Sequence, residues 1–189
     1  MEKESKQRFR LTKLERAWIL YDVGNSAYTM LACSLIPIWF KSIAVGPAPG
    51  QISSDNATAY YSLAVSIVTV AVALLGPVLG ALADHKDKKR MYFTSAAALG
   101  MIFCVLTGFA WSWLLFLILF VVTKICYSAS LTIYDSMLGD ITTEDRMDEV
   151  SSNGFAWGYL GSCIPFLIAL IAYVLGPDMV GLIPALLSR

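Results

Sequence analysis

The sequence predicts an all-α fold, a polytopic bundle of transmembrane helices with five complete spans and a partial sixth. Of the 189 residues, 57% are hydrophobic and 15% are charged, whereas a soluble domain of this size has about 25% charged residues. Several apolar runs reach the roughly 20 residues that cross a bilayer as a helix. Short basic segments flank these runs, as is typical of loops held on the cytoplasmic side of a membrane.

The apolar runs define the order of the elements. A basic segment, residues 1–16, precedes a transmembrane domain, residues 17–189. The five complete spans are expected at 17–43, 59–83, 91–110, 113–137 and 152–175. After Gly176 and Pro177 only about half a span remains, residues 178–189. Either a sixth helix is cut short there, or this segment lies at the outer interface.

Lysine and arginine set the expected orientation. Six of the fourteen basic residues precede the first span and four lie in the turn 86–90, so both segments are expected to be cytoplasmic. The loops 44–58 and 110–113, which have no basic residue, then lie outside. The loop 138–151 is inside by alternation. Its threonines 142 and 143 are placed to cap a short amphipathic helix on the inner surface.

The first span has a polar stripe. Its polar residues recur at offsets that fall on one face of a helix: Asp22, Asn25, Ser26, Thr29 and Cys33. The fourth span has a second stripe of this kind: Lys124, Tyr127, Ser128 and Asp135. Because lipid tolerates such faces poorly, we expect the two stripes to line a shared aqueous or protein-lined cavity.

Lys124 is the most informative single residue. It lies near the middle of its span, where a charge costs about 2.5–3.5 kcal/mol on insertion scales. One interpretation is a lysine that is neutralised or paired to hold the bundle together. The other is a cation that contacts a solute or ion in a central cavity. On the second interpretation, Lys124→Ala abolishes transport while the protein still inserts.

Small residues in the second and fifth spans predict close helix contacts. Gly76 and Gly80 form a G-x-x-x-G pair, as do Gly154 and Gly158. Gly161 and Ser162 continue the second of these faces.

Other classes of function find no support in the sequence. The basic residues lie in short segments beside spans and do not form the basic face that nucleic-acid binding needs. The four cysteines fall inside apolar runs without a C-x-x-C pair, and the single histidine, His85, has no neighbour at metal-ligand spacing. No nucleophile and base occur at catalytic spacing. We therefore expect no catalytic residues, metal or cofactor, and no enzyme.

The turn GALADHKDKKR, residues 80–90, joins two spans and places an acid, Asp84, at a helix end where the helix dipole disfavours it. The residues Gly80, Asp84, Lys88, Lys89 and Arg90 in this turn resemble the signature between the second and third helices of the major facilitator superfamily. That resemblance implies a charge relay that latches the two halves of a carrier. Asp87 stands where the signature usually has glycine.

Two further runs resemble one branch of that superfamily, the vacuole effluxers. They are WILYDVGNSAYT, residues 18–29, and YDSMLGDITTEDRMDEVSSNGFAWGYLGS, residues 134–162. The branch includes vacuolar amino-acid exporters and many bacterial members, so the resemblance implies a bacterial cell membrane and amino-acid efflux. In the superfamily twelve helices form two six-helix halves. The chain corresponds to the N-terminal half alone.

The expected function is therefore that of a secondary carrier of small solutes acting by alternating access, in a half-length form. The expected path residues are Asp22, Asn25, Ser26, Lys124, Tyr127 and Asp135. The expected partners are the lipid bilayer, a small solute with or without protons, and a second carrier half or a second copy of the chain. The alternative is a non-transporting membrane subunit or remnant that binds another membrane protein.

Overall fold

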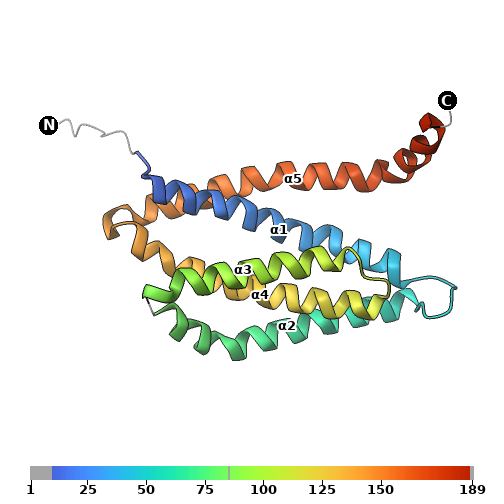
Figure 1. The fold of residues 1–189 in the computed structure, drawn as a ribbon, viewed down its shortest axis with the longest axis horizontal. Helices are drawn as coiled ribbons and strands as arrows, with labels where there is room; N and C mark the ends of the chain where they lie inside the picture. The colour runs from blue at the N-terminus through green and yellow to red at the C-terminus, as the bar shows by residue number, and fades with distance from the viewer. Residues whose placement is uncertain (1–9, 85, 188–189) are drawn as a thin grey trace. The chain divides into compact units, whose positions relative to one another are not determined.

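The computed structural model describes residues 10–84 and 86–187, with side chains at all of these positions except 83, 86, 87 and 176–187. Residues 1–9 of the predicted basic segment, His85, and the last two residues of the predicted partial span lie outside this description. All regular secondary structure in the described residues is helical (Figure 1). The predicted all-α fold is therefore confirmed.

Five helices account for the described chain. They are α1 (Lys13–Ala44), α2 (Ser54–Ala83), α3 (Lys86–Thr107), α4 (Trp113–Ile141) and α5 (Glu144–Leu187). Each contains a stretch long and apolar enough to cross a membrane. Large apolar side chains lie exposed on the helices, for example Leu74, Met101 and Ile164, each more than 60% exposed. Such faces suit contact with lipid tails.

Helix boundaries differ from the predicted spans where a polar residue caps or extends a helix. The α2 helix begins at Ser54 because the Ser53 hydroxyl accepts a hydrogen bond from the Asn56 amide, 3.3 Å away. The α3 helix begins at Lys86 and takes in Lys88, Lys89 and Arg90. The basic residues predicted for a loop therefore lie in the first turns of a helix.

The predicted loop 138–151 is wrong. The α4 helix continues to Ile141 and α5 begins at Glu144, so only Thr142 and Thr143 separate them. Thr143 precedes the new helix, with Glu144 and Asp145 in its first turn, where acids interact favourably with the helix dipole. The expected short helix is instead the start of a helix continuous with the fifth span. At its other end, α5 runs on past Gly176 and Pro177 to Leu187.

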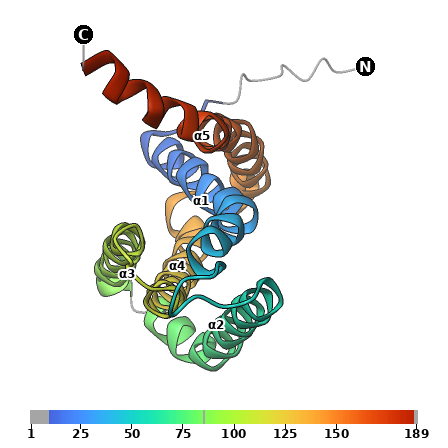
Figure 2. The same ribbon diagram turned by 90° about the vertical axis from the view of Figure 1, so that its right-hand side faces the viewer.

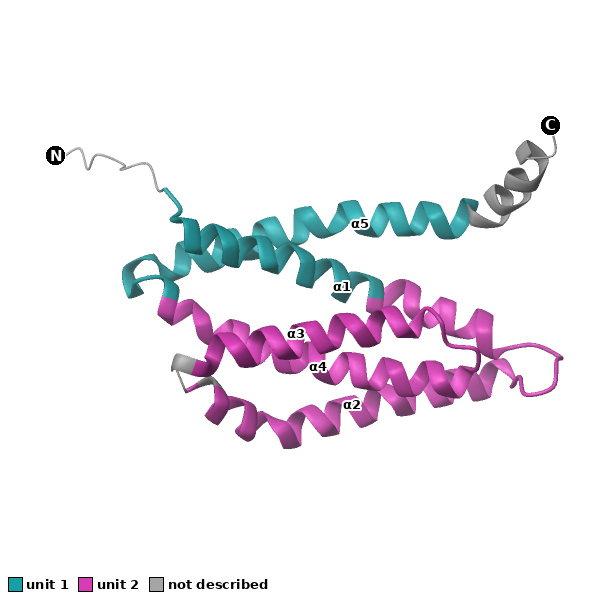
Figure 3. Ribbon diagram, in the orientation of Figure 1, with its two compact units in different colours: residues 1–31, 141–189 teal, residues 32–140 magenta. Residues whose placement is uncertain are grey.

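The chain divides into two compact units (Figure 3). The first unit contains residues 1–31 and 141–189, and within it the start of α1 packs on α5. Glycines of α5 allow this approach, because a methyl group added to Gly154 would lie 2.6 Å from the Trp18 ring, and one added to Gly161 would lie 2.4 Å from Val23. The Ser162 hydroxyl contacts the Met30 sulfur at 3.0 Å. The predicted contact face of α5 is confirmed.

The second unit contains residues 32–140, with the end of α1, all of α2 and α3, and α4 up to its last residue, Ile141, which belongs to the first unit. In the view turned by 90°, α4 lies between α2 and α3 (Figure 2). Its core is built from buried aromatic and small side chains: Phe40, Ala44, Ala57, Ala64, Phe116, Leu117 and Phe120. Tilted ring pairs join Phe40 to Phe116 and Tyr61 to Phe120, with centroids 5.5 and 5.2 Å apart.

The loop between α1 and α2 is attached to this core. The indole nitrogen of Trp113 donates to the Gly50 carbonyl at 2.9 Å, and the Trp113 ring stacks on Tyr60 at 5.2 Å. Gly50 has a φ of 90°, which glycine adopts without strain.

The other predicted glycine contact is not found in the described chain. No atom lies within 4 Å of a methyl group placed on Gly76 or on Gly80. The G-x-x-x-G pair of α2 therefore faces open space here, whereas that of α5 is covered.

Candidate functional site

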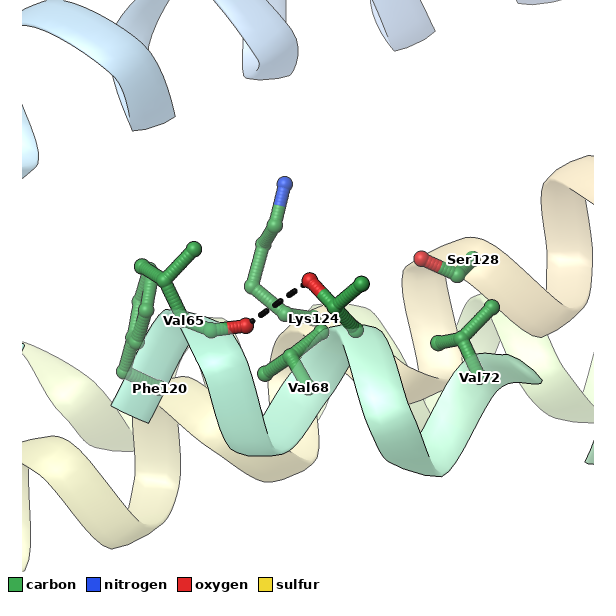
Figure 4. Close-up of a pocket in the computed structure, with 7 residues that line it drawn as sticks. Val65, Val68, Val72, Phe120, Lys124 and Ser128 are labelled. Atoms are coloured by element: carbon green, nitrogen blue, oxygen red, sulfur yellow. Dashed lines mark hydrogen bonds between the residues drawn. The ribbon is translucent and has the colours of Figure 1, made fainter. Parts of the chain in front are cut away.

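Lys124 lines a cavity between α2 and α4 in the second unit (Figure 4). The cavity has a volume of about 330 Å³. Its lining residues are Val65, Val68, Thr69, Val72, Phe120, Lys124 and Ser128. Lys124 is the one charged residue among them, so the walls are mostly apolar around a single cation.

The polar groups of the cavity differ in what they can donate. Thr69 donates its hydroxyl hydrogen to the Val65 carbonyl at 3.0 Å, so its oxygen presents lone pairs only. In Figure 4 the Lys124 side chain extends from α4, and its nitrogen points away from the labelled valines. The same nitrogen lies 5.1 Å from the centroid of the Tyr127 ring, within cation–π range. A lysine ammonium offers three donors and no acceptor.

The residues of the predicted polar stripe of α4, which include the path residues Lys124, Tyr127 and Asp135, therefore lie at different places. Lys124 and Ser128 line the cavity, and Tyr127 contacts Lys124. Asp135 is exposed and lies eleven residues further along the helix, about 16 Å away at 1.5 Å per residue. The polar stripe predicted from the spacing lies on one face of the helix. The cavity is lined by the N-terminal part of this stripe, and Asp135 lies outside it.

The polar stripe of α1 lies against α5 in the first unit. A methyl group on Gly158 would lie 2.7 Å from Oδ2 of Asp22 and 2.9 Å from Oγ of Ser26. These two oxygens therefore converge on the backbone of α5 at a glycine. Asn25 belongs to the same face, and the Thr29 hydroxyl donates to its carbonyl at 3.2 Å. The structure thus brings Asp22 and Ser26 together at a point that only glycine leaves open.

The basic turn contains one ion pair with a buried cation. Lys89 is 7% exposed, and its nitrogen lies 2.6 Å from Oδ2 of Asp140 and 3.3 Å from the Ser136 carbonyl. In the described residues Asp84, Lys88 and Arg90 are exposed, and no ion pair joins Asp84 to any of the three bases. The motif is therefore divided between one cation buried against α4 and three charges at the surface.

Sequence reasoning missed Asp140 as the partner of Lys89. The two residues are separated by 51 positions, and the periodicity of one helix does not show which residue of another it meets. The available signal is that Asp140 ends a helix, where an acid is unfavourable unless a cation lies beside it.

A buried carboxylate at the start of α1 was also missed. Glu15 is 1% exposed and accepts four hydrogen bonds, from Arg146 Nε and Nη2, the Thr142 hydroxyl and the Thr12 amide, at 2.7–3.1 Å. The Glu15 amide in turn donates to the Thr12 hydroxyl at 3.2 Å. This reciprocal pair is a capping box, and the run T-K-L-E, residues 12–15, is its sequence signature.

The fold and the site define a class of protein: a polytopic α-helical protein of the membrane, with a cation in a mostly apolar cavity between two spans. The chain belongs to the Major Facilitator Superfamily, whose sequence profile matches residues 26–188. This is a family of membrane transporters. The match takes in the basic turn, Lys124 and Asp140.

A relative supports the assignment. The chain is 38% identical over 169 residues to the uncharacterized MFS-type transporter YxiO of Bacillus subtilis (strain 168). The matched region is 88% of this chain and 39% of the relative, so the chain spans well under half of the relative's length. No solved structure matches the chain.

Proposed function

We propose that this chain forms the N-terminal half of a secondary carrier that moves small solutes by alternating access. The observation that supports this most directly is the cavity beside Lys124, because a membrane helix keeps a charge at mid-span only where the charge is used or paired. Asp22, Asn25, Ser26, Lys124, Tyr127 and Asp135 line the path. Membership of a transporter superfamily supports the same function.

The basic turn acts as the conformational latch of this carrier. Gly80, Asp84, Lys88, Lys89 and Arg90 make up the motif, and the Lys89–Asp140 pair fixes its buried cation to α4. The remaining charges are exposed and available to a second half of the carrier. Formation and release of these contacts alternate as the carrier changes state.

The second half comes from a separate chain, from a second copy of this chain or from further sequence of the same protein. The length of the relative supports a carrier larger than this chain.

From the vacuole-effluxer resemblance we propose amino acids as the first solutes to test and a bacterial cell membrane as the location. We further propose a cytoplasmic N-terminus, from its basic residues, and coupling to protons through the carboxylates of the spans.

The test is solute flux in liposomes that contain the full chain, alone and together with the C-terminal half of the B. subtilis relative. Efflux of labelled amino acids is expected for the wild type and is expected to be lost in Lys124→Ala, while Lys41→Ala serves as the control at an exposed lysine. Normal flux in Lys124→Ala would overturn the role of this residue. Absence of flux for every solute, with and without the added half, would favour a non-transporting membrane subunit.

A further inference from the structure

The cavity beside Lys124 has a chemistry that selects among solutes. Val65, Val68 and Val72 of α2 and Phe120 of α4 line the cavity, so most of the wall is aliphatic or aromatic. The lining residues include a lysine, a serine and a threonine, and none of them is acidic. An ammonium group placed here would meet a like charge with no carboxylate among the lining residues. An anion would meet a cation.

The donors lie close to one another along α4. Lys124 and Ser128 are four residues apart, which places them on the same face one turn from each other. The Thr69 hydroxyl donates its one hydrogen to the Val65 carbonyl, whereas the Lys124 ammonium has three hydrogens and can donate to more than one acceptor. Lys124 and Ser128 are therefore the donors that we assign to a ligand. A carboxylate accepts through two oxygens and can therefore use both donors, whereas a neutral amide or alcohol uses them less well.

The size of the cavity limits the rest of the ligand. Its volume, about 330 Å³, lies at the lower end of the range of small-molecule sites, about 300–1,000 Å³. Three valines and a phenylalanine favour a short aliphatic group over a polar one, because burial of apolar surface contributes about 25 cal/mol per Å².

Building on the proposed carrier function, we propose that this cavity binds a small aliphatic carboxylate. Its carboxylate lies on Lys124 and Ser128, and its aliphatic part packs on the valines of α2 and on Phe120. Two kinds of ligand carry such a carboxylate: a short fatty acid and an aliphatic amino acid. The lining residues supply no carboxylate for an amino group, so a plain monocarboxylate binds at least as tightly as the amino acid.

The test is equilibrium binding of radiolabelled isovalerate to the full chain in nanodiscs, with unlabelled isovaleramide, isopentylamine and leucine as competitors. Isovalerate is expected to bind, leucine to compete no better than unlabelled isovalerate, and the amide and the amine to compete at least tenfold more weakly. Competition by the amide or the amine equal to that of isovalerate would overturn the proposal. Tighter competition by leucine would overturn the absence of an amino-group site.

Variants of Lys124 and Ser128 test whether the ligand carboxylate binds at these two side chains. Lys124→Gln is expected to weaken isovalerate binding by about 10- to 100-fold, as loss of a charge-assisted hydrogen bond does, and Lys124→Arg is expected to retain most of it. Lys41→Gln is the matched control. Ser128→Asp, which places a carboxylate beside Lys124, is expected to abolish isovalerate binding. If Lys124→Gln does not insert, Ser128→Asp against Ser128→Ala decides the question, and equal binding by these two would overturn the site.

This experiment separates the site from the carrier function. Carboxylate binding that depends on Lys124, without flux in liposomes, leaves the site standing and contradicts the carrier. Flux of solutes that does not depend on Lys124 or on a carboxylate contradicts the site and leaves the carrier standing.

Discussion

The side chain of Arg146 holds both carboxylate oxygens of Glu15, with Nε 3.1 Å from Oε1 and Nη2 2.8 Å from Oε2. This two-point contact fixes the first turn of α1 to the first turn of α5. Thr142 adds a third donor from the short connection between α4 and α5. The carboxylate of Glu15 therefore joins the start of α1, the start of α5 and the connection before α5.

Glu15→Gln is expected to destabilise the protein more than Thr12→Ala does. The glutamine keeps the size of the side chain but removes the charge that accepts from Arg146 and Thr142, whereas Thr12→Ala removes a helix cap worth about 1 kcal/mol. Thermal unfolding in detergent micelles measures both, with Glu144→Gln as the control at an exposed acid of α5. A melting temperature of Glu15→Gln equal to that of the wild type would contradict this role.

Gly158→Ala is expected to be destabilising, and Gly76→Ala is expected to be neutral or slightly stabilising. The new methyl group at 158 would meet Asp22 and Ser26 at less than 3.0 Å, whereas the one at 76 would meet nothing within 4 Å. Overpacking costs about 1–3 kcal/mol, and an alanine in a helix gains about 0.5–1 kcal/mol over glycine. Unfolding in mixed micelles at increasing denaturing detergent measures the difference. Equal stability of the two variants would refute the contact of α1 with α5 at this glycine.

Lys89→Met is expected to lower stability, while Lys88→Met changes little. Lys89 is buried against Asp140 and the Ser136 carbonyl, and loss of a hydrogen bond to a charged group costs about 1.5–3 kcal/mol. Lys88 is exposed. The comparison uses the same unfolding assay, and the exchange of Lys89 and Asp140 in one double variant should recover part of the loss. Similar losses for the two single variants would rule out a special role for Lys89.

Trp113→Phe is expected to loosen the loop between α1 and α2 without unfolding the second unit. The phenylalanine keeps an aromatic ring beside Tyr60 but loses the hydrogen bond to the Gly50 carbonyl, worth about 0.5–1.5 kcal/mol. Hydrogen exchange of the amides in residues 45–53 should become faster, while that of α3 stays the same. Trp111→Phe, at a side chain that is 87% exposed, is the control. Unchanged exchange in the loop would show that this bond does not hold it.

Much of the fold could be predicted from the sequence because each membrane span is determined by residues that are close together in the sequence. Apolar length alone places the helices, and the 3.6-residue period places Asp22 and Ser26 on one face. The glycines of α5 were predicted to allow close packing for a local reason as well, since small residues at such spacing let two helix backbones approach closely. Lys124 stood out because a charge at mid-span is costly.

The partners of the buried charges could not be predicted in this way. The pairs Lys89–Asp140 and Glu15–Arg146 join residues 51 and 131 positions apart. The position of Asp140 near a helix end indicates that a cation lies beside it, and T-K-L-E indicates the capping box of Glu15, but neither signal identifies Lys89 or Arg146 as the partner. For the glycines of α2 the sequence predicted a contact that the described chain does not make. Their spacing is the same as that of the α5 glycines, but no atom lies against them. Spacing predicts that a face can be approached closely, and the tertiary structure decides whether it is.

The burial of Glu15 also constrains the order in which the protein is assembled during synthesis. The second unit is one continuous stretch, residues 32–140, and can close as soon as its helices have entered the bilayer. The first unit joins the two ends of the chain, and Glu15 and Arg146 are 131 positions apart, a delay of roughly 7–26 s at ordinary rates of translation. During that interval the start of α1 has neither its arginine nor the glycine face of α5. The first helix to be made is therefore among the last to be fully packed.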